Sequence, residues 1–201
     1  MLDGWARQRL DPALNGIAQA LVKTGATANA VTGLGFAIGA AAALVIAQGW
    51  FWIGAGLILL SRLCDGLDGA VAKLRGRTDL GGYLDIVLDF AFYGMVPLGF
   101  VVADPQANGI AGAVLLTAFY ANGASFLAYA IMAEKQGLAS DARGPKSLFF
   151  TTGLAEATET IAIFVAMCAF PRLFPVLAYG FAAVTVYTTV SRIWLATRTF
   201  R

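Results

Sequence analysis

Histidine is absent from this 201-residue chain, and charged residues make up only 13% of it. The lack of histidine excludes imidazole general bases, nucleophiles activated by histidine and the usual histidine-rich zinc sites. Any acid–base chemistry must therefore use carboxylates, lysine, tyrosine or cysteine. The two cysteines, Cys64 and Cys168, lie within apolar segments, where we expect small buried thiols and no disulfide.

Hydrophobic residues make up 59% of the chain, and its mean hydropathy is +0.72. These values are typical of integral membrane proteins. A helix that crosses a hydrocarbon core about 30 Å thick needs about 20 mostly apolar residues. The sequence therefore predicts an all-α integral membrane protein, a single domain over residues 1–201, with six transmembrane helices at residues 30–47, 50–72, 80–103, 110–133, 148–170 and 173–197. Gly35 and Gly39 on the first of these indicate close helix packing.

The first 28 residues are predicted to form a juxtamembrane amphipathic segment. Leu10, Leu14, Ile17 and Leu21 recur at helical spacing, with polar residues elsewhere on the turn. This pattern indicates a helix that lies on the membrane surface. Because the segment lacks the charged-then-apolar order of a cleaved signal peptide, we expect the chain to be inserted whole.

Lysine and arginine residues gather in the loops on one side of the predicted membrane domain, while the other side has only Arg172. The first group consists of Arg7, Arg9, Lys23, Lys73, Arg75, Arg77, Lys135, Arg143, Lys146, Arg198 and Arg201. Positively charged loops stay in the cytoplasm. We therefore expect both termini to lie on the cytoplasmic side of a bacterial inner membrane. The net charge of +2 says little about partners and gives no footprint of nucleic-acid binding, so we expect no nucleic-acid partner.

Four aspartates interrupt the apolar segments: Asp65 and Asp68, three residues apart, and Asp85 and Asp89, four apart. On helices each pair projects from one face, so the two pairs can converge at the cytoplasmic end of neighbouring helices. Carboxylates that share a low-dielectric pocket repel one another unless cations compensate their charge. The sequence therefore predicts a site for hard divalent cations, two of which could share the four side chains.

Two other interpretations explain the aspartates less well. An ion network with Lys73, Arg75 and Arg77 accounts for single charges but not for the paired spacings, nor for the small residues Gly69 and Ala72 beside them. These small residues leave a flat helix surface that a ring or a diphosphate can approach. A divalent-cation transporter would also use intramembrane acids, but it requires them near the midplane of the membrane and on broken helices.

Residues 65–89 resemble the signature of the CDP-alcohol phosphotransferase family, class I. The signature is Asp, two residues, Asp-Gly, two residues, Ala-Arg, a spacer, Gly, three residues, Asp, three residues, Asp. The matching residues here are Asp65, Asp68, Gly69, Ala72, Lys73, Gly81, Asp85 and Asp89. Lys73 replaces the usual arginine, and the spacer before Gly81 is one residue shorter than usual. The stretch "GATANAVTGLG" is similar to the family's Thr-Pro-Asn segment at the start of the first membrane helix, with Ala28 in place of proline.

The resemblance implies a phospholipid-synthesising transferase in which an alcohol hydroxyl attacks the β-phosphorus of a CDP-linked donor and CMP leaves. It implies that Asp65, Asp68 and Asp85 hold two Mg²⁺ or Mn²⁺ ions, and that Asp89 takes the proton of the acceptor and also contacts a metal. The residues implied to bind the donor are Asn29, Thr32, Gly69, Ala72, Lys73 and Gly81.

The identities of the donor and acceptor stay open at the level of the sequence. The first interpretation is CDP-diacylglycerol with a small alcohol, in a homodimer surrounded by membrane lipids. The alternative is a CDP-choline or CDP-ethanolamine donor with a lipid alcohol such as diacylglycerol as the acceptor. Glu156 and Glu159, three residues apart in an apolar segment, would suit a cationic head group in the acceptor. They would equally suit an ion pair with Arg62 or Arg192.

Arg143 and Lys146 form a cytoplasmic basic group before the fifth predicted span. Such a group binds either an anionic acceptor or the phosphates of membrane lipids.

Overall fold

The computed structural model describes residues 2–138 and 157–200, with side chains described from residue 12 onward. Every regular element in these two ranges is a helix, which confirms the all-α prediction. The helices are α1 (Leu2–Lys23), α2 (Ala28–Ala47), α3 (Phe51–Arg75), α4 (Asp79–Ala103), α5 (Pro105–Lys135), α6 (Ala157–Ala169) and α7 (Phe174–Thr199), with the 3₁₀ turn η3 (Pro171–Leu173) before α7.

Four segments of the described chain are long and apolar enough to cross a membrane: α2, α4, α5 and the stretch from Pro171 to Thr199. They coincide with four of the six predicted spans. Of the other two predicted spans, residues 50–72 are helical within α3, and the described part of 148–170 forms α6. Helix α3 carries five charged residues between Arg62 and its end at Arg75, and the described part of α6 has 13 residues.

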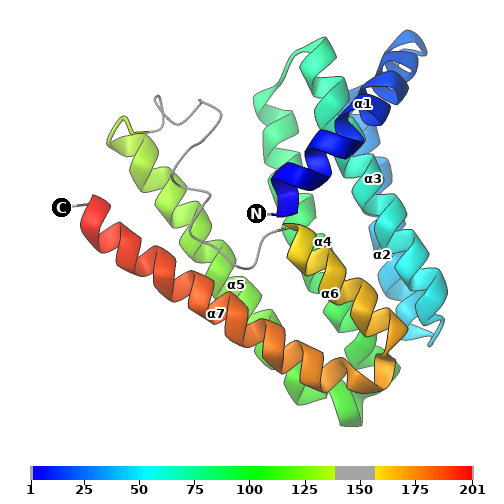
Figure 1. Cartoon of the computed structure of the whole chain (residues 1–201), viewed down its shortest axis with the longest axis vertical. Coiled ribbons are helices and arrows are strands. Elements are labelled where there is room, and N and C mark those ends of the chain that lie inside the picture. Colours follow the sequence, from blue (N-terminus) through cyan, green and yellow to red (C-terminus); the bar gives the residue numbers. More distant parts are fainter. Residues whose placement is uncertain (1, 139–156, 201) are drawn as a thin grey trace.

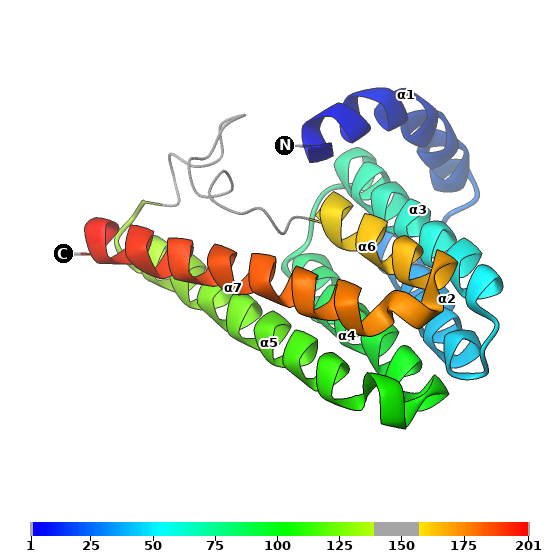
Figure 2. The same ribbon diagram turned by 60° about the horizontal axis from the view of Figure 1, so that its bottom comes forward.

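Helix α2 lies between α3 and α4 and packs against both. A short connection from Ala47 to Phe51 makes α2 and α3 antiparallel neighbours. Helices α5 and α7 run side by side, and in both views their C-terminal ends extend away from α1 and α3 (Figures 1 and 2). The chain thus forms one cluster around α2 and one long pair, α5 with α7.

Large aromatic side chains fill the core where the helices meet. Phe92, Phe100, Phe164 and Phe174 are fully buried. The rings of Phe100 and Phe174 stack with centroids 4.9 Å apart, and those of Phe92 and Phe164 meet edge to face at 6.1 Å. Contacts of this kind join α4 to α6 and α7, which are distant in the sequence.

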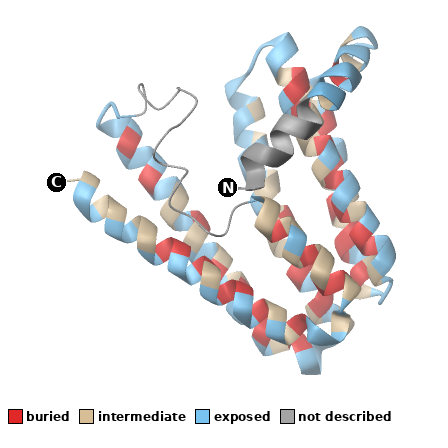
Figure 3. Ribbon diagram, in the orientation of Figure 1, coloured by how far each residue is buried: buried red, intermediate tan, exposed pale blue. Residues whose placement is uncertain are grey.

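The outward faces of the same helices are exposed (Figure 3), and many of their side chains are large and apolar. Trp52 is 73% exposed, Ile110 76% and Val176 68%. A water-soluble protein rarely exposes so much continuous apolar surface. The distribution fits helices whose outer faces contact lipid.

Helix α1 packs across the C-terminal half of α3 (Figure 1). Ala18 is buried against Ala70 and Val71, and Arg75 Nη2 donates a hydrogen bond to the carbonyl oxygen of Val22 at 3.1 Å. A helix is therefore present in the predicted N-terminal segment. Its amphipathic character and its position on the membrane surface stay predictions.

Glycines allow α2 to approach α3 and α4 closely, as the sequence predicted. A Cβ atom added at Gly35 would lie 2.9 Å from the Cβ atom of Cys64, and one added at Gly39 would lie 2.6 Å from the Phe92 ring. The hydroxyl of Ser61 donates a hydrogen bond to the carbonyl oxygen of Gly35 at 2.7 Å across the same interface. Since Cys64 and Cys168 are both free and buried, the expectation of no disulfide is confirmed.

We expect Gly39→Ala to destabilise the protein by about 1–3 kcal/mol, because the new methyl group would have to displace a fully buried ring. Thermal unfolding in detergent measures the effect. Gly33→Ala on the same helix is the matched control, since nothing lies within 4 Å of its added Cβ atom. Alanine is a better helix former than glycine, so the control should unfold at the same temperature or slightly higher. Equal unfolding temperatures for both variants would contradict the close packing.

Candidate active site

The turn between α3 and α4 places each aspartate on α3 at a similar distance from the turn as one aspartate on α4. Gly76, with φ 99°, ends α3 in a conformation that favours glycine. Two residues later the Thr78 hydroxyl accepts a hydrogen bond from the backbone N–H of Gly81 at 3.0 Å and caps α4. Asp68 lies seven residues before the end of α3, and Asp85 lies six residues after the start of α4. At a rise of about 1.5 Å per residue, both lie about 10 Å from the turn.

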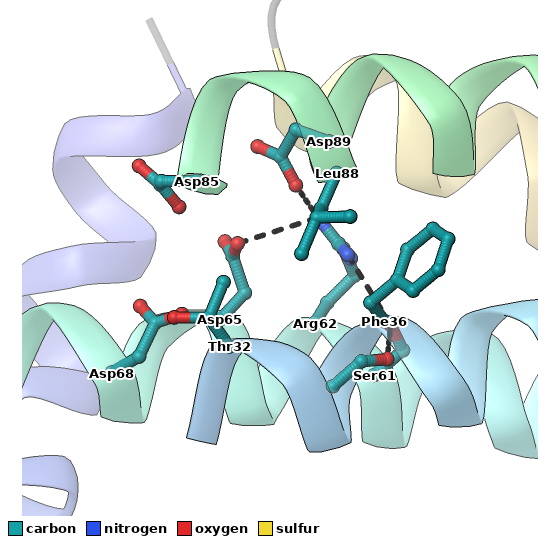
Figure 4. A pocket seen from close by; sticks show the side chains of 10 residues that line it. Thr32, Phe36, Ser61, Arg62, Asp65, Asp68, Asp85, Leu88 and Asp89 are labelled. Carbon is teal, nitrogen blue, oxygen red and sulfur yellow. Dashed lines mark hydrogen bonds and ion pairs between the residues drawn. The ribbon is translucent and has the colours of Figure 1, made fainter. Parts of the chain in front are cut away.

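Asp65 and Asp89 lie about one helical turn further from the α3–α4 turn, on the same two helices. Side-chain oxygens of Asp65, Asp68 and Asp85 all lie within 4.8 Å of one another. Figure 4 shows these three carboxylates pointing into one cavity, with Asp89 at its other end. The predicted convergence of the two pairs is thus present, with Asp89 set apart from the other three.

Helix α2 forms the floor of this cavity with Thr32, Gly35 and Phe36. Because α2 packs against both α3 and α4, it sets the distance between these two helices, and the carboxylates lie in the space between them. The site is therefore built from three helices, although all four aspartates belong to two of them.

The three clustered carboxylates fit a hard divalent cation. Asp68 is only 6% exposed, and its Oδ2 atom is buried without a hydrogen-bond partner. An unpaired buried carboxylate oxygen is costly, and a cation relieves that cost. All the available donors are oxygens, which suits Mg²⁺ or Mn²⁺ better than softer metals.

Arg62 compensates part of the negative charge, and the sequence analysis did not place it here. Its Nη1 atom lies 2.6 Å from Asp89 Oδ1 and 3.5 Å from Asp65 Oδ1. The signal that was missed is the spacing of three residues between Arg62 and Asp65 on one helix. The proposed network with Lys73, Arg75 and Arg77 has no counterpart among the described ion pairs of the aspartates, which all involve Arg62.

Of the six residues implied to bind the donor, Thr32 lines the cavity, and the other five lie on the first turns of α2 and α4 and the last turns of α3. Gly69 is exposed, with open space where a Cβ atom would lie, and Lys73 is also exposed. Gly81 brings the first turns of α2 and α4 together, because an added Cβ atom would lie 3.0 Å from Asn29 Oδ1. The Thr32 side chain lies beside Asp68 (Figure 4), and its hydroxyl donates to the carbonyl oxygen of Ala28 at 3.0 Å. Ala72, on the last turns of α3, is half-buried.

Glu159 lies in the first turn of α6, and its Oε2 atom is buried without a hydrogen-bond partner. The two arginines considered as its partners are engaged elsewhere. Arg62 pairs with Asp89, and Arg192 Nη1 donates hydrogen bonds to Asn122 and Ser125 on α5. The other predicted acceptor residues, Glu156, Arg143 and Lys146, lie outside the described residues.

Comparison with known proteins agrees with this geometry. The family model for CDP-alcohol phosphatidyltransferases matches residues 26–194. The chain belongs to this family, and it is a CDP-alcohol phosphotransferase of phospholipid biosynthesis. The match covers every described helix except α1 and the last turn of α7.

Two curated relatives are similar over long stretches. The inner membrane protein YnjF of Escherichia coli (strain K12) is 45% identical over 194 residues, which is 96% of this chain and 94% of that protein. The archaetidylinositol phosphate synthase of Methanothermobacter thermautotrophicus is 33% identical over 140 residues, which is 69% of this chain and 64% of that protein. The likeness to YnjF indicates that this chain is a bacterial inner membrane protein.

Among solved structures, the phosphatidylinositol phosphate synthase of Mycobacterium tuberculosis with CDP-DAG bound has a similar fold. The TM-score is 0.69 at 26% identity, and the match covers 90% of this chain and 91% of that one. The same enzyme in complex with manganese and citrate gives a TM-score of 0.69 as well, with 90% and 87% covered. A divalent metal bound to the aspartate cluster is consistent with these comparisons.

Proposed function

We propose that this protein transfers a phosphatidyl group from CDP-diacylglycerol to a small alcohol and releases CMP, in a reaction that depends on a divalent metal. The observation that carries the proposal is the convergence of Asp65, Asp68 and Asp85, with an unpaired buried oxygen on Asp68. The CDP-DAG complex of the similar mycobacterial enzyme supports the choice of donor. Because the chain belongs to a family of transferases, the comparison does not support the divalent-cation transporter interpretation.

In the proposed mechanism Asp65, Asp68 and Asp85 would hold two ions, Mg²⁺ or Mn²⁺. Asp89 is the fourth carboxylate of the site and acts as the base. When bound, the metal supplies charge stabilisation for the diphosphate and for the leaving CMP. Asp89 takes the proton of the attacking hydroxyl, in concert with attack because a carboxylate is a weak base for an alcohol. The pocket aligns the hydroxyl with the β-phosphorus, which contributes a large part of the rate enhancement.

The donor would bind along the small residues at the mouth of the cavity. Open space beside Gly69 lets the cytidine ring approach the backbone of α3, with Ala72 one turn further on. Lys73 supplies one positive charge to the diphosphate without the bidentate geometry of arginine. Thr32 lines the α2 side of the cavity, Asn29 on the first turn of α2 lies beside Gly81, and Gly81 acts by allowing α2 and α4 to meet.

We further propose that all six apolar helices cross the membrane, with α1 on its cytoplasmic surface and both chain termini in the cytoplasm. The charged residues of α3 gather toward the end that carries Lys73 and Arg75, where they would reach the membrane surface. This arrangement places the acid cavity near water, as soluble acceptors require. The resemblance also supports a homodimer surrounded by membrane lipids.

The experiment that tests this function is CMP release by the purified protein over a grid of donors and acceptors. The donors are CDP-diacylglycerol, CDP-choline and CDP-ethanolamine. The acceptors are diacylglycerol and small alcohols. Inositol phosphate is the first small alcohol to test, because two similar proteins are named archaetidylinositol phosphate synthase and phosphatidylinositol phosphate synthase. We expect turnover with CDP-diacylglycerol and a small alcohol. Turnover limited to CDP-choline or CDP-ethanolamine with diacylglycerol would reverse the proposed roles of the two substrates.

Glu159 is proposed to contact the acceptor, because its buried Oε2 atom lacks a protein partner. We expect Glu159→Gln to raise the KM of an amino-alcohol acceptor about tenfold, because the carboxylate would pair with its cationic head group. The change corresponds to a loss of ~1.4 kcal/mol of binding. The KM of the donor should stay unchanged. Because neither Arg62 nor Arg192 pairs with Glu159, the melting temperature should also stay the same.

Steady-state kinetics and thermal unfolding on the same preparation measure both quantities. Glu134→Gln, at an exposed position near the end of α5, is the matched control and should change neither. A destabilised Glu159→Gln protein with an unchanged acceptor KM would contradict the recognition role.

A further inference from the structure

Arg62 has an unusual position between the acid cavity and the aromatic core. Its side chain is 11% exposed, and it reaches from α3 to Asp89 on α4 with an Nη1 to Oδ1 distance of 2.6 Å. Its guanidinium group lies over the Phe92 ring, 4.1 Å from the centroid. A buried cation at this distance from a carboxylate forms a strong, charge-assisted hydrogen bond.

We propose that Arg62 is a positioning residue that fixes the carboxylate of Asp89 through Oδ1, so that Oδ2 faces the hydroxyl of the acceptor. The inference rests on the proposed transferase function. It assigns metal binding to Asp65, Asp68 and Asp85, and proton removal to Asp89 positioned by Arg62. Asp65, Asp68 and Asp85 converge within 4.8 Å, whereas Asp89 is held apart by the guanidinium. No donor within the described residues contacts Asp89 Oδ2, which leaves this atom available for the substrate.

Arg62 is itself held rigidly, as a positioning residue must be. Its Nη2 atom donates to Ser61 Oγ at 3.2 Å, and the Ser61 hydroxyl donates in turn to the carbonyl oxygen of Gly35 at 2.7 Å. Phe92 beneath the guanidinium is fully buried and packs against the space left by Gly39. The connection therefore runs from α2 through α3 to α4, and each member is locked by packing.

A different role for Arg62 is possible on charge alone. Its Nη1 atom also lies 3.5 Å from Asp65, so the guanidinium compensates charge beside the clustered carboxylates. If it did only that, its removal would favour metal binding and would leave turnover intact. The two roles therefore differ in whether kcat falls while metal affinity is kept.

The test uses the full-length protein with Arg62→Gln and Arg62→Lys, and compares kcat, donor KM, Mn²⁺ affinity by direct titration, and melting temperature in chelator. We expect Arg62→Gln to lower kcat about 100-fold, since misplacement of a reacting group has effects of this size. Donor KM should stay within about threefold, and Mn²⁺ affinity should be unchanged or higher. Arg62→Lys keeps the charge but loses the fork, and should recover part of kcat.

Arg75→Gln is the matched control, because it removes the same charge from the same helix and contacts a backbone carbonyl of α1 instead of an aspartate. It should retain full turnover. Combining Arg62→Gln with Asp89→Asn completes a double-mutant cycle. If the two residues act as one unit, the double variant should be no slower than Asp89→Asn alone.

An unchanged kcat in Arg62→Gln would overturn the inference. So would a double variant whose loss of kcat equals the product of the two single losses. In both cases, turnover by the wild-type protein would still support the proposed function. Loss of Mn²⁺ binding together with a lower melting temperature would assign Arg62 a structural role only, and would also overturn it. Failure of the wild-type protein to release CMP from any donor would overturn the proposed function, and this inference with it.

Discussion

Chelation with EDTA is expected to abolish CMP release, and added Mg²⁺ or Mn²⁺ is expected to restore it. Three carboxylates within 4.8 Å of one another would otherwise face the negatively charged diphosphate of the donor. Arg62 compensates only part of this charge, since its closest partner is Asp89. Lewis-acid stabilisation contributes several kcal/mol to a reaction of this kind, so the residual rate should be at least about 10³-fold lower.

Ca²⁺ added to the same chelated protein is an informative comparison, because it binds oxygen ligands at longer distances and with looser geometry than Mg²⁺. We expect it to restore much less activity than Mg²⁺. Full turnover in the presence of excess EDTA would contradict metal dependence. A melting curve in EDTA separates loss of metal from loss of fold.

Asparagine at Asp65, Asp68 or Asp85 should lower Mn²⁺ affinity, donor affinity and kcat together. Asn keeps the shape of the side chain and removes the charge on which cation binding depends. We expect the largest effect, at least about 10²-fold in kcat/KM, at Asp68, which is the most buried of the three. Direct Mn²⁺ titration and steady-state kinetics on each variant measure the two properties separately.

Asp89→Asn should lower mainly kcat, whereas the three other variants should lower metal and donor affinity as well. If its chief task is to take the proton of the acceptor, kcat should fall by about 10²- to 10⁴-fold while Mn²⁺ affinity and donor KM change little. Asp79→Asn, at an exposed position in the first turn of α4, is the matched control and should behave as wild type. Equal loss of metal binding in all four variants would identify Asp89 as another ligand.

Local spacing in the sequence was sufficient to predict the helical architecture and the core of the site. Apolar segments of about 20 residues define the helices, and separations of three and four residues place each aspartate pair on one helix face. The short turn at Gly76 then sets Asp68 and Asp85 at similar heights. These relations depend on helix geometry alone, which is nearly constant from one protein to another.

Only the tertiary structure decided which side chain pairs with the fourth aspartate, Asp89. Arg62 and Asp89 are 27 residues apart on different helices, and their ion pair depends on the separation of α3 and α4. That separation is set by α2, whose glycines allow close contact with Ser61, Cys64 and Phe92. Sequence spacing fixes which face of a helix a residue occupies, but the neighbour across the interface depends on the packing of all three helices at once. For the same reason the sequence left the partner of Arg62 open, and the packed structure joined it to Asp89.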